Sequence, residues 1–198
     1  YLHLFQISII FLMKKKLILI STKAITVNTF LDQLIIDLKK NFNIKVYVSD
    51  PKNIKISCNK SQINFPSSLL ELFNIFSLFK TLNQIRKIIE KNHSKSEIFV
   101  HTPLAAHLVR VALFFNKKKI VYFVHGFRFH KQTNIFNYII FAAIEILLKY
   151  KTKYYFVINQ EDKFFVKKIL KKKYYFVNGI GINLKKRLVN NKYKNKKK

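Results

Sequence analysis

Short apolar runs alternate with longer amphipathic segments along most of this chain, and this alternation constrains the fold more than any other feature of the sequence. The runs are mostly apolar and only four to six residues long, which suits strands that are buried on both faces. They are residues 17–20, 44–48, 97–100, 119–124, 154–158 and 174–177. The alternation predicts a Rossmann-like, doubly wound α/β domain, in which a parallel sheet carries helices on both faces.

The segments between these runs place apolar residues at helical spacing. The predicted helices cover residues 29–40, 67–92, 103–115, 134–150 and 161–170. Residues 49–66 contain Pro51 and Pro66, so we predict a loop there with a short strand at residues 54–57. The helix over residues 67–92 has a wide apolar stripe, which we expect to pack on the sheet; contact with a membrane surface is the alternative.

The formal net charge of +29 is the composition feature with the most consequence for partners. Of 38 basic residues only four are arginine, and the chain is rich in Lys, Asn, Ile, Phe and Tyr, as an AT-rich coding sequence would produce. No recognition motif accompanies the lysines, so we predict no nucleic-acid partner. The single cysteine, Cys58, excludes an internal disulfide and a cysteine-based zinc site, and fits a reducing, cytoplasmic compartment.

The two ends of the chain differ in composition from its middle. Residues 1–12 (YLHLFQISIIFL) are apolar but precede three lysines, which is the wrong order for a signal peptide, and they are too short to span a bilayer. We expect them to be an apolar leader outside the fold, with the domain over residues 13–184. Residues 185–198 are rich in lysine and asparagine and are predicted to be a basic, disordered tail.

Polar segments follow five of the predicted strands, and ligands bind at the carboxyl ends of strands in an open parallel sheet. These segments are STKAITVN, HTPLAAH, HGFRFHK, NQED and NGIGIN. His125 is the strongest candidate, because it ends a strand beside Gly126, where the backbone can approach a ligand closely.

The other histidines have less specific positions. His101 ends a strand before Thr102, a plausible helix cap, so a structural role and a ligand contact are both open for His101. His107 lies inside a predicted helix, where a packed position and one at the solvent edge are both open, and His130 is expected to lie in a loop.

Several familiar chemistries lack their motifs. The first strand is followed by a segment without glycine, so there is no dinucleotide-binding fingerprint, and no phosphate-binding Gly-Lys-Ser/Thr loop occurs. The histidines lack the spacing and acidic companion of a zinc protease, and no serine occupies a strand-to-helix elbow. The sequence therefore predicts no cofactor and no metal.

Three stretches of sequence carry a family resemblance. They are VHTPLAAHLVRVALFFNKKKIVYFVHGFRFHK, NYIIFAAIEILLKYKTKYYFVINQEDKFFVKKI and YYFVNGIGINL, which occur in this order. Together they resemble the amino-terminal domain of family 4 glycosyltransferases, and most closely the bacterial enzymes of capsule and exopolysaccharide assembly. The resemblance covers roughly residues 13–184 and is specific from Val100 onward.

This resemblance implies the amino-terminal half of a GT-B architecture, which transfers a sugar from a nucleotide donor with retention of configuration and without an essential metal. His125 matches the strand-end histidine near the reacting sugar, which makes it the catalytic candidate. The substrate-binding candidates implied by the same matches are His101, Thr102, Gly126, Phe127, Arg128, His130, Asn159, Glu161, Asn178 and Gly179. Asp162 belongs to the same matched element as Asn159 and Glu161.

The predicted function is hexosyl transfer from a nucleotide-sugar donor to a saccharide or lipid-linked acceptor in cell-surface polysaccharide synthesis. The family's donor-binding domain and its spaced glutamates have no counterpart after residue 184, so we expect the donor to bind through a second domain and this chain alone to be inactive. Peripheral contact with an anionic membrane, at the inner face of the plasma membrane, is a further expectation. The alternative is a non-catalytic α/β module that binds anionic lipid or a lipid-linked saccharide.

Overall fold

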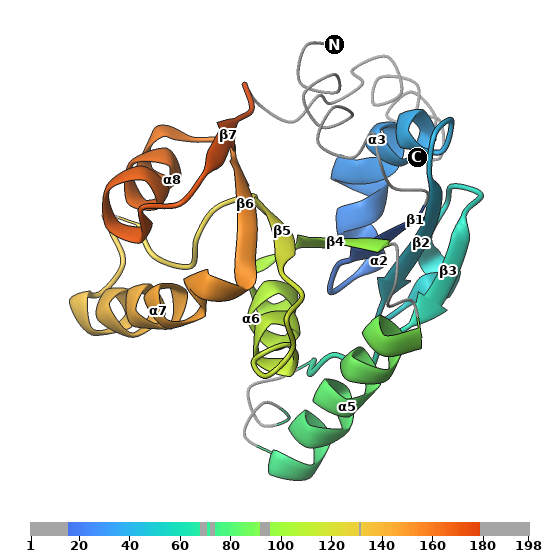
Figure 1. The fold of residues 1–198 in the computed structure, drawn as a ribbon, viewed down its shortest axis with the longest axis horizontal. Helices are drawn as coiled ribbons and strands as arrows, with labels where there is room; N and C mark the ends of the chain where they lie inside the picture. The colour runs from blue at the N-terminus through green and yellow to red at the C-terminus, as the bar shows by residue number, and fades with distance from the viewer. Residues whose placement is uncertain (1–15, 68–70, 72–73, 92–95, 131, 179–198) are drawn as a thin grey trace, which may run out of the picture.

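The computed structural model describes residues 16–67, 71, 74–91, 96–130 and 132–178, and these form a seven-stranded sheet in which every pairing is parallel (Figure 1). The strand order is β3-β2-β1-β4-β5-β6-β7. The strands are β1 Lys16–Ile20, β2 Asn43–Val48, β3 Asn59–Gln62, β4 Ser96–His101, β5 Ile120–Val124, β6 Thr152–Val157 and β7 Tyr174–Phe176. The expected leader over residues 1–12 and the expected tail over residues 185–198 lie outside the described residues.

Helices occupy each predicted helical segment. Two of these helical segments contain a π-helical stretch next to an α-helical one. Two short 3-10 turns lie between other elements. The elements are α2 Ala24–Thr26, η1 Val27–Leu31, α3 Asp32–Leu38, η2 Pro51–Asn53, α5 Ile75–Lys91, α6 Pro103–Ala112, α7 Ile135–Leu148, η3 Lys149–Lys151, α8 Gln160–Phe164 and η4 Phe165–Leu170. The first helical segment begins at Ala24, five residues before the predicted start at Thr29.

The prediction of a third strand at residues 54–57 is wrong. The strand lies at Asn59–Gln62, where it pairs with β2 at the edge of the sheet. Its sequence, NKSQ, is wholly polar, because most of its residues are exposed and need no apolar side chains. Ile54 belongs to the preceding loop, where it is buried against the core.

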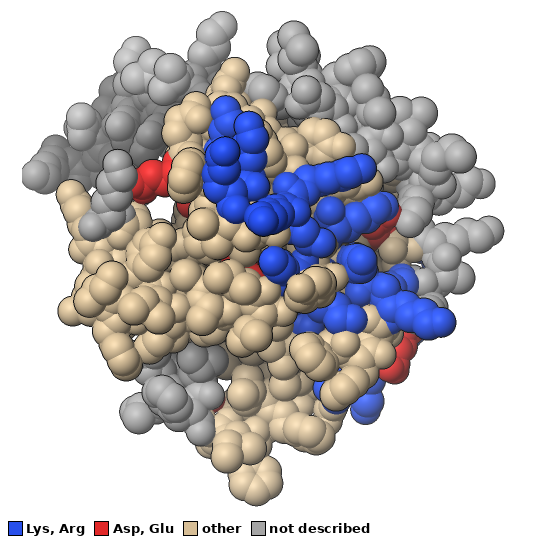
Figure 2. Space-filling view, turned by 60° about the vertical axis from the view of Figure 1, so that its left-hand side comes forward, with Lys and Arg blue, Asp and Glu red and all other residues tan. Residues whose placement is uncertain are grey.

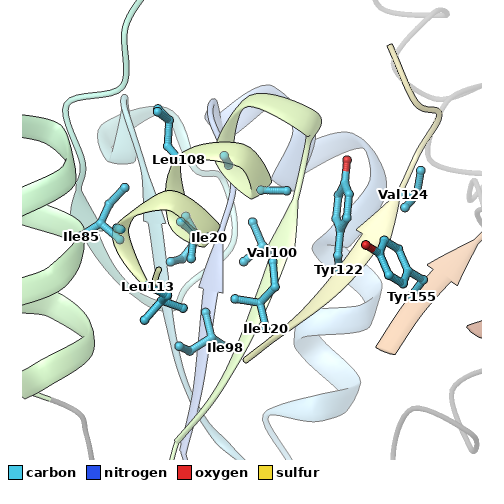
Figure 3. Packing of buried hydrophobic residues seen from close by; sticks show 14 of the residues in the cluster. Ile20, Ile85, Ile98, Val100, Leu108, Leu113, Ile120, Tyr122, Val124 and Tyr155 are labelled. Atoms are coloured by element: carbon cyan, nitrogen blue, oxygen red, sulfur yellow. The ribbon is translucent and has the colours of Figure 1, made fainter. Parts of the chain in front are cut away.

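Two apolar cores cover the two faces of the sheet, as a doubly wound fold requires. One face packs against α5, α6, α7 and η4, through residues such as Ile85, Val109 and Val166. Figure 3 shows this core, with strand residues Ile20 and Val100 beneath the helix layer. The other face packs against the segment from α2 to α3.

The winding of the chain reverses beside β1. From β1 the chain builds outward through β2 and β3, then returns to place β4 on the opposite side of β1. The loops after β1 and β4 therefore diverge and leave a crevice at the carboxyl edge of the sheet. This reversal is where open α/β sheets bind their ligands.

Candidate functional site

A cavity of about 240 Å³ occupies this crevice, and residues that follow five strands line it. Its lining comprises Thr22, Lys23, Ser49, Phe65, Pro66, Ser67, Thr102, Pro103, Leu104 and Arg128. Lys23 and Arg128 supply two cations, and the hydroxyl groups supply hydrogen-bond donors and acceptors. The lining therefore suits an anionic or polyhydroxylated ligand.

The two strand-end histidines contact each other at the same edge of the sheet. His101 Nδ1 lies 3.1 Å from His125 Nε2, so β4 and β5 are joined at their ends by a side-chain hydrogen bond. The ring of His101 stacks on Phe123, and that of His125 lies 5.3 Å from the ring of Phe30. Neither histidine lines the cavity, but Thr102, which directly follows His101, does.

Burial keeps both imidazoles neutral at pH 7. It lowers the pKa of His125 to about 4, and it lowers the pKa of His101 well below its usual value, with His125 adding a smaller effect. In a neutral pair one ring donates its N–H and the other accepts. The remaining nitrogens, His101 Nε2 and His125 Nδ1, are buried and have no hydrogen-bond partner among the described residues.

Thr102 is held in an unusual backbone conformation beside this pair. Its φ is 73° and its ψ is 139°, a region that β-branched residues rarely adopt. It occupies the N-cap position of α6, yet its side chain makes no capping bond, so the prediction of a side-chain cap is wrong. Its Oγ1 is also buried without a partner within the described part of the chain. Strain combined with an unsatisfied hydroxyl is typical of functional sites.

The backbone conformation at position 126 favours glycine, whereas the space around this position would admit a side chain. Its φ is 137°, which favours glycine, while a Cβ built at this position would meet no atom within 4 Å. The sharp change of direction after His125 turns the chain back toward the core, where Phe127 is buried.

The loop after Gly126 brings one of its three substrate-binding candidates, Arg128, to the cavity. Phe127 and Phe129 are both buried, with parallel rings 5.1 Å apart that pack on Phe165, so the structure does not place Phe127 in the cavity. Arg128 is exposed between them, lines the cavity and lies over the ring of Phe141. His130 is exposed and forms a turn, in which its Nδ1 accepts from the backbone N–H of Gln132.

The candidates after β6 are tied to this loop. Asn159 caps α8 by accepting from the backbone N–H of Asp162, and its own side chain donates to the Asp162 carboxylate at 2.7 Å. Asp162 also accepts from the backbone N–H of Phe127 at 3.4 Å, and burial raises its pKa. Glu161 is exposed and lines a separate cavity of about 460 Å³.

Of the two candidates after β7, one is among the described residues. Asn178 is exposed just beyond β7, and Gly179 lies outside the described residues.

A second buried polar cluster was not predicted from the sequence. Arg110 of α6 and Glu145 of α7 are almost completely buried and form two hydrogen bonds, at 2.7 and 2.8 Å. The Arg110 Nε donates to the carbonyl of Ala106, and Glu145 also contacts His107 Nε2 at 2.9 Å. Of the two positions left open for His107, the structure shows the packed one, with 16% of its side chain exposed. The signal that could have indicated the pair is a lone arginine and a lone glutamate in helices that contain no other Lys, Arg, Asp or Glu.

The Arg110–Glu145 pair remains charged. Burial alone would raise the pKa of Glu145, but the Arg110 guanidinium outweighs it and lowers this pKa to about 2. Burial alone would likewise lower the pKa of Arg110, but Glu145 raises it.

Two further observations concern metals and membranes. Within the described ranges, no three His, Cys, Asp or Glu residues lie close enough to hold a metal ion. Among the helices described, none has both the length and the hydropathy needed to cross a bilayer.

Comparison with known proteins places the fold. No family model and no curated protein matches the sequence. Among solved structures, a chain that comprises part of sucrose-phosphate synthase from Thermosynechococcus elongatus matches with a TM-score of 0.60 and 12% identity over 90% of this chain and 96% of that chain. A UDP-glucosyltransferase from Polygonum tinctorium matches with a TM-score of 0.53 and 10% identity, over 84% of this chain and 52% of that chain.

An epimerase has the same fold. UDP-GlcNAc 2-epimerase from Methanocaldococcus jannaschii matches with a TM-score of 0.53 and 16% identity, over 82% of this chain and 45% of that chain. The chain therefore spans about half the length of these longer proteins. The fold is the Rossmann-like α/β domain found in GT-B glycosyltransferases and in this epimerase, as the sequence predicted.

Proposed function

We propose that this chain is the acceptor-side domain of a retaining GT-B glycosyltransferase. The reaction would transfer a hexosyl unit from a nucleotide-sugar to a saccharide or lipid-linked acceptor in cell-surface polysaccharide synthesis, with the donor held mainly by a second domain. The fold supports this proposal, and so does the family resemblance of the strand-end segments.

The observation that carries the proposal is the His101–His125 pair. Because the pair leaves His125 Nδ1 buried and unsatisfied, a sugar hydroxyl that reaches this atom would remove the cost of an unpaired polar group. A pKa of about 4 leaves His125 neutral at pH 7, so its role is to position the transferred sugar or the acceptor by hydrogen bonding. Thr102 and Arg128 in the adjoining cavity would contact further hydroxyl or phosphate groups.

His101 acts through His125 in this proposal. Its Nδ1 holds the His125 ring in one orientation and fixes which tautomer faces the ligand. His101 is therefore a positioning residue. Donor phosphate contacts that stabilise the leaving group would come from the second domain.

A binding experiment tests this function on the chain as it exists. Saturation-transfer NMR with UDP-glucose, UDP-N-acetylglucosamine, glucose and N-acetylglucosamine should detect binding of at least one of these probes by the wild-type chain. His125→Ala should reduce that signal at least tenfold, whereas Lys87→Ala, exposed on α5 and outside the cavity lining, should leave it unchanged. Equal binding by wild type and His125→Ala, or no binding of any probe by the wild type, would overturn the proposal.

A second candidate is a non-catalytic module for anionic lipid or a lipid-linked saccharide. The lysine-rich surface described below favours it. Sugar transfer from either labelled nucleotide-sugar into a lipid extract, on mixing this chain with a donor domain, would argue against this candidate.

A further inference from the structure

The outer side of α7 is an apolar surface that no part of the described structure covers. Seven large apolar or aromatic residues of α7 and η3 are each between 38% and 70% exposed. They are Ile135, Phe136, Ile139, Ile140, Ile146, Leu147 and Tyr150, hereafter the α7 face. Their three- and four-residue spacing places them on one side of the helix. The only charged residue of α7 is Glu145, which is buried in the pair with Arg110.

A cluster of lysines borders the carboxyl end of α7. Lysines precede or begin β5, β6 and β7, and because these strands are parallel, the lysines gather at the amino edge of the sheet. They are Lys117, Lys118, Lys119, Lys149, Lys151, Lys153, Lys171, Lys172 and Lys173, hereafter the lysine edge. Burial lowers the pKa of Lys172, and the charges of Lys119 and Lys149 lower it further, so lysines from all three strand starts lie near one another.

The α7 face and the lysine edge are continuous. Lys149 and Lys151 belong to η3, which follows α7 directly and also carries Tyr150 of the α7 face. Figure 2, which brings the side of α7 and α8 forward, shows a broad area without charged residues beside a dense group of lysines. An apolar helix face flanked by lysines is the arrangement by which helices lie in the surface of an anionic bilayer.

Two partners could cover the α7 face, a second copy of the chain or a lipid surface, and the net charge of the chain favours the lipid surface. A second copy would hold together two chains that each carry a net charge of +29, and electrostatic repulsion opposes this. An anionic lipid surface satisfies both features, because acyl chains accept the apolar residues and lipid phosphates attract the lysines. We propose that the α7 face and the lysine edge dock on an anionic lipid surface, with α7 lying in the plane of the interface.

This orientation has a consequence for the candidate site, although the docking surface does not depend on the proposed function. The helix α7 begins after the loop that follows His125 and ends at η3, which carries lysines of the lysine edge, and Figure 1 shows α7 lying across the direction of β6. A helix of its length extends over roughly 20 Å. With α7 on the bilayer, the end of the loop that joins His125 to α7 lies beside the lipid headgroups, where a lipid-linked acceptor would be presented.

Tryptophan fluorescence tests which helix meets the lipid, because the chain contains no tryptophan. Phe136→Trp places the probe on the α7 face, and Phe76→Trp places a matched probe on α5, where Phe76 is 89% exposed. On adding mixed phosphatidylglycerol and phosphatidylcholine vesicles, the probe at 136 should shift to the blue and be quenched by brominated acyl chains, while the probe at 76 should not. Quenching at 76 alone, or at neither position, would overturn the proposal.

Co-sedimentation with the same vesicles tests the lysine edge. Replacing Lys119, Lys149 and Lys172 by glutamine should weaken partitioning by about fivefold per lysine, hence roughly a hundredfold in all, at low salt. The matched control replaces Lys52, Lys55 and Lys60, which are exposed at the β3 edge, and should lose far less. Equal losses in the two triple variants would mean that net charge alone governs binding and that the lysine edge is not the contact.

A dimer formed through the α7 face is the alternative to lipid binding, and measuring self-association tests it. Analytical ultracentrifugation without lipid should find a monomer at micromolar concentration. A dimer that Phe136→Ser dissociates would assign the α7 face to a second copy, and the lipid proposal would fail.

Discussion

The molecule contains two buried polar clusters that differ in how completely their hydrogen bonds are satisfied. In the Arg110–Glu145 cluster, all three guanidinium nitrogens have partners and the carboxylate accepts from both side chains that approach it. In the His101–His125 cluster, one bond joins the rings, and the second nitrogen of each ring is buried and has no partner among the residues described. His101 is as deeply buried as Arg110 and Glu145, while His125 is partly exposed, so burial alone does not distinguish structure from function.

Their positions explain the difference. The Arg110–Glu145 pair lies between α6 and α7, above the ring of Tyr122, where both side chains are almost completely buried. Figure 3 shows Tyr122 beside Tyr155 at this position, and the Tyr155 hydroxyl is 3.5 Å from the guanidinium. The histidines lie instead at the carboxyl ends of β4 and β5. A cluster with spare hydrogen-bonding capacity at a strand end is suited to bind a ligand, whereas a fully satisfied cluster inside the layers stabilises their packing.

The largest expected effect on stability comes from breaking the Arg110–Glu145 cluster, in which all three guanidinium nitrogens have partners. Glu145→Leu leaves the Arg110 charge buried without its partner, so the free energy of unfolding should fall by about 3–5 kcal/mol. Urea denaturation followed by circular dichroism measures this change. The double variant Arg110→Met with Glu145→Leu should recover most of the loss, because an apolar pair replaces the ion pair. A double variant as unstable as Glu145→Leu alone would contradict this account.

At the His101–His125 cluster, whose hydrogen bonds are only partly satisfied, we expect a smaller effect on stability but a larger one on ligand binding. His125→Ala removes the partner of a neutral ring, so unfolding should become easier by about 1–3 kcal/mol, the cost of one unsatisfied buried group. The sugar signal in saturation-transfer NMR should fall at least tenfold, while Glu145→Leu should retain it at a temperature where that variant is folded. Retained binding in His125→Ala together with lost binding in folded Glu145→Leu would reverse the roles assigned to the two clusters.

The two clusters should lose their contributions to the free energy of unfolding in different pH ranges. The folded pKa of His125, about 4, is below its usual 6.5, so between these values the unfolded state binds more protons and stability falls as pH is lowered. The slope is about 1.4 kcal/mol per pH unit for each such histidine. Glu145, with a pKa of about 2 against a usual 4.5, loses its contribution only between pH 4.5 and 2.

Denaturation midpoints across this range check the assignment. His125→Asn should flatten the decline between pH 6.5 and 4 and leave the decline below pH 4.5 in place. An unchanged slope in His125→Asn would show that other groups cause the decline at mildly acidic pH.

The sequence predicted those features whose cause is local. The strands at the centre of the sheet are apolar because both of their faces are covered, so their pattern is visible without the structure. The edge strand Asn59–Gln62 escaped prediction because exposure removes the apolar pattern, and the start at Ala24 was missed because a π-helical turn shifts the helical spacing.

Features that depend on contacts between distant segments were predicted only in part. His101 and His125 were each selected by position at a strand end, but their mutual hydrogen bond follows from the pairing of β4 with β5, which the sequence does not state. Arg110 and Glu145 are 35 residues apart, and nothing local connects them. The burial of Phe127 depends on the turn at Gly126, whose direction the sequence does not reveal.

The smallest expected effect tests why Thr102 is retained in a strained conformation. Thr102→Ala removes a buried hydroxyl that has no described partner, and Thr102→Gly also relieves the positive φ, so neither should lower the free energy of unfolding by more than about 1 kcal/mol. If the hydroxyl serves the ligand, both variants should weaken sugar binding, and Thr102→Ser should preserve it. Thermal denaturation and saturation-transfer NMR give the two measurements. If Thr102→Ala were strongly destabilising and left sugar binding unchanged, Thr102 would have a structural role like that of the Arg110–Glu145 cluster. His125 would then contact the ligand without help from Thr102.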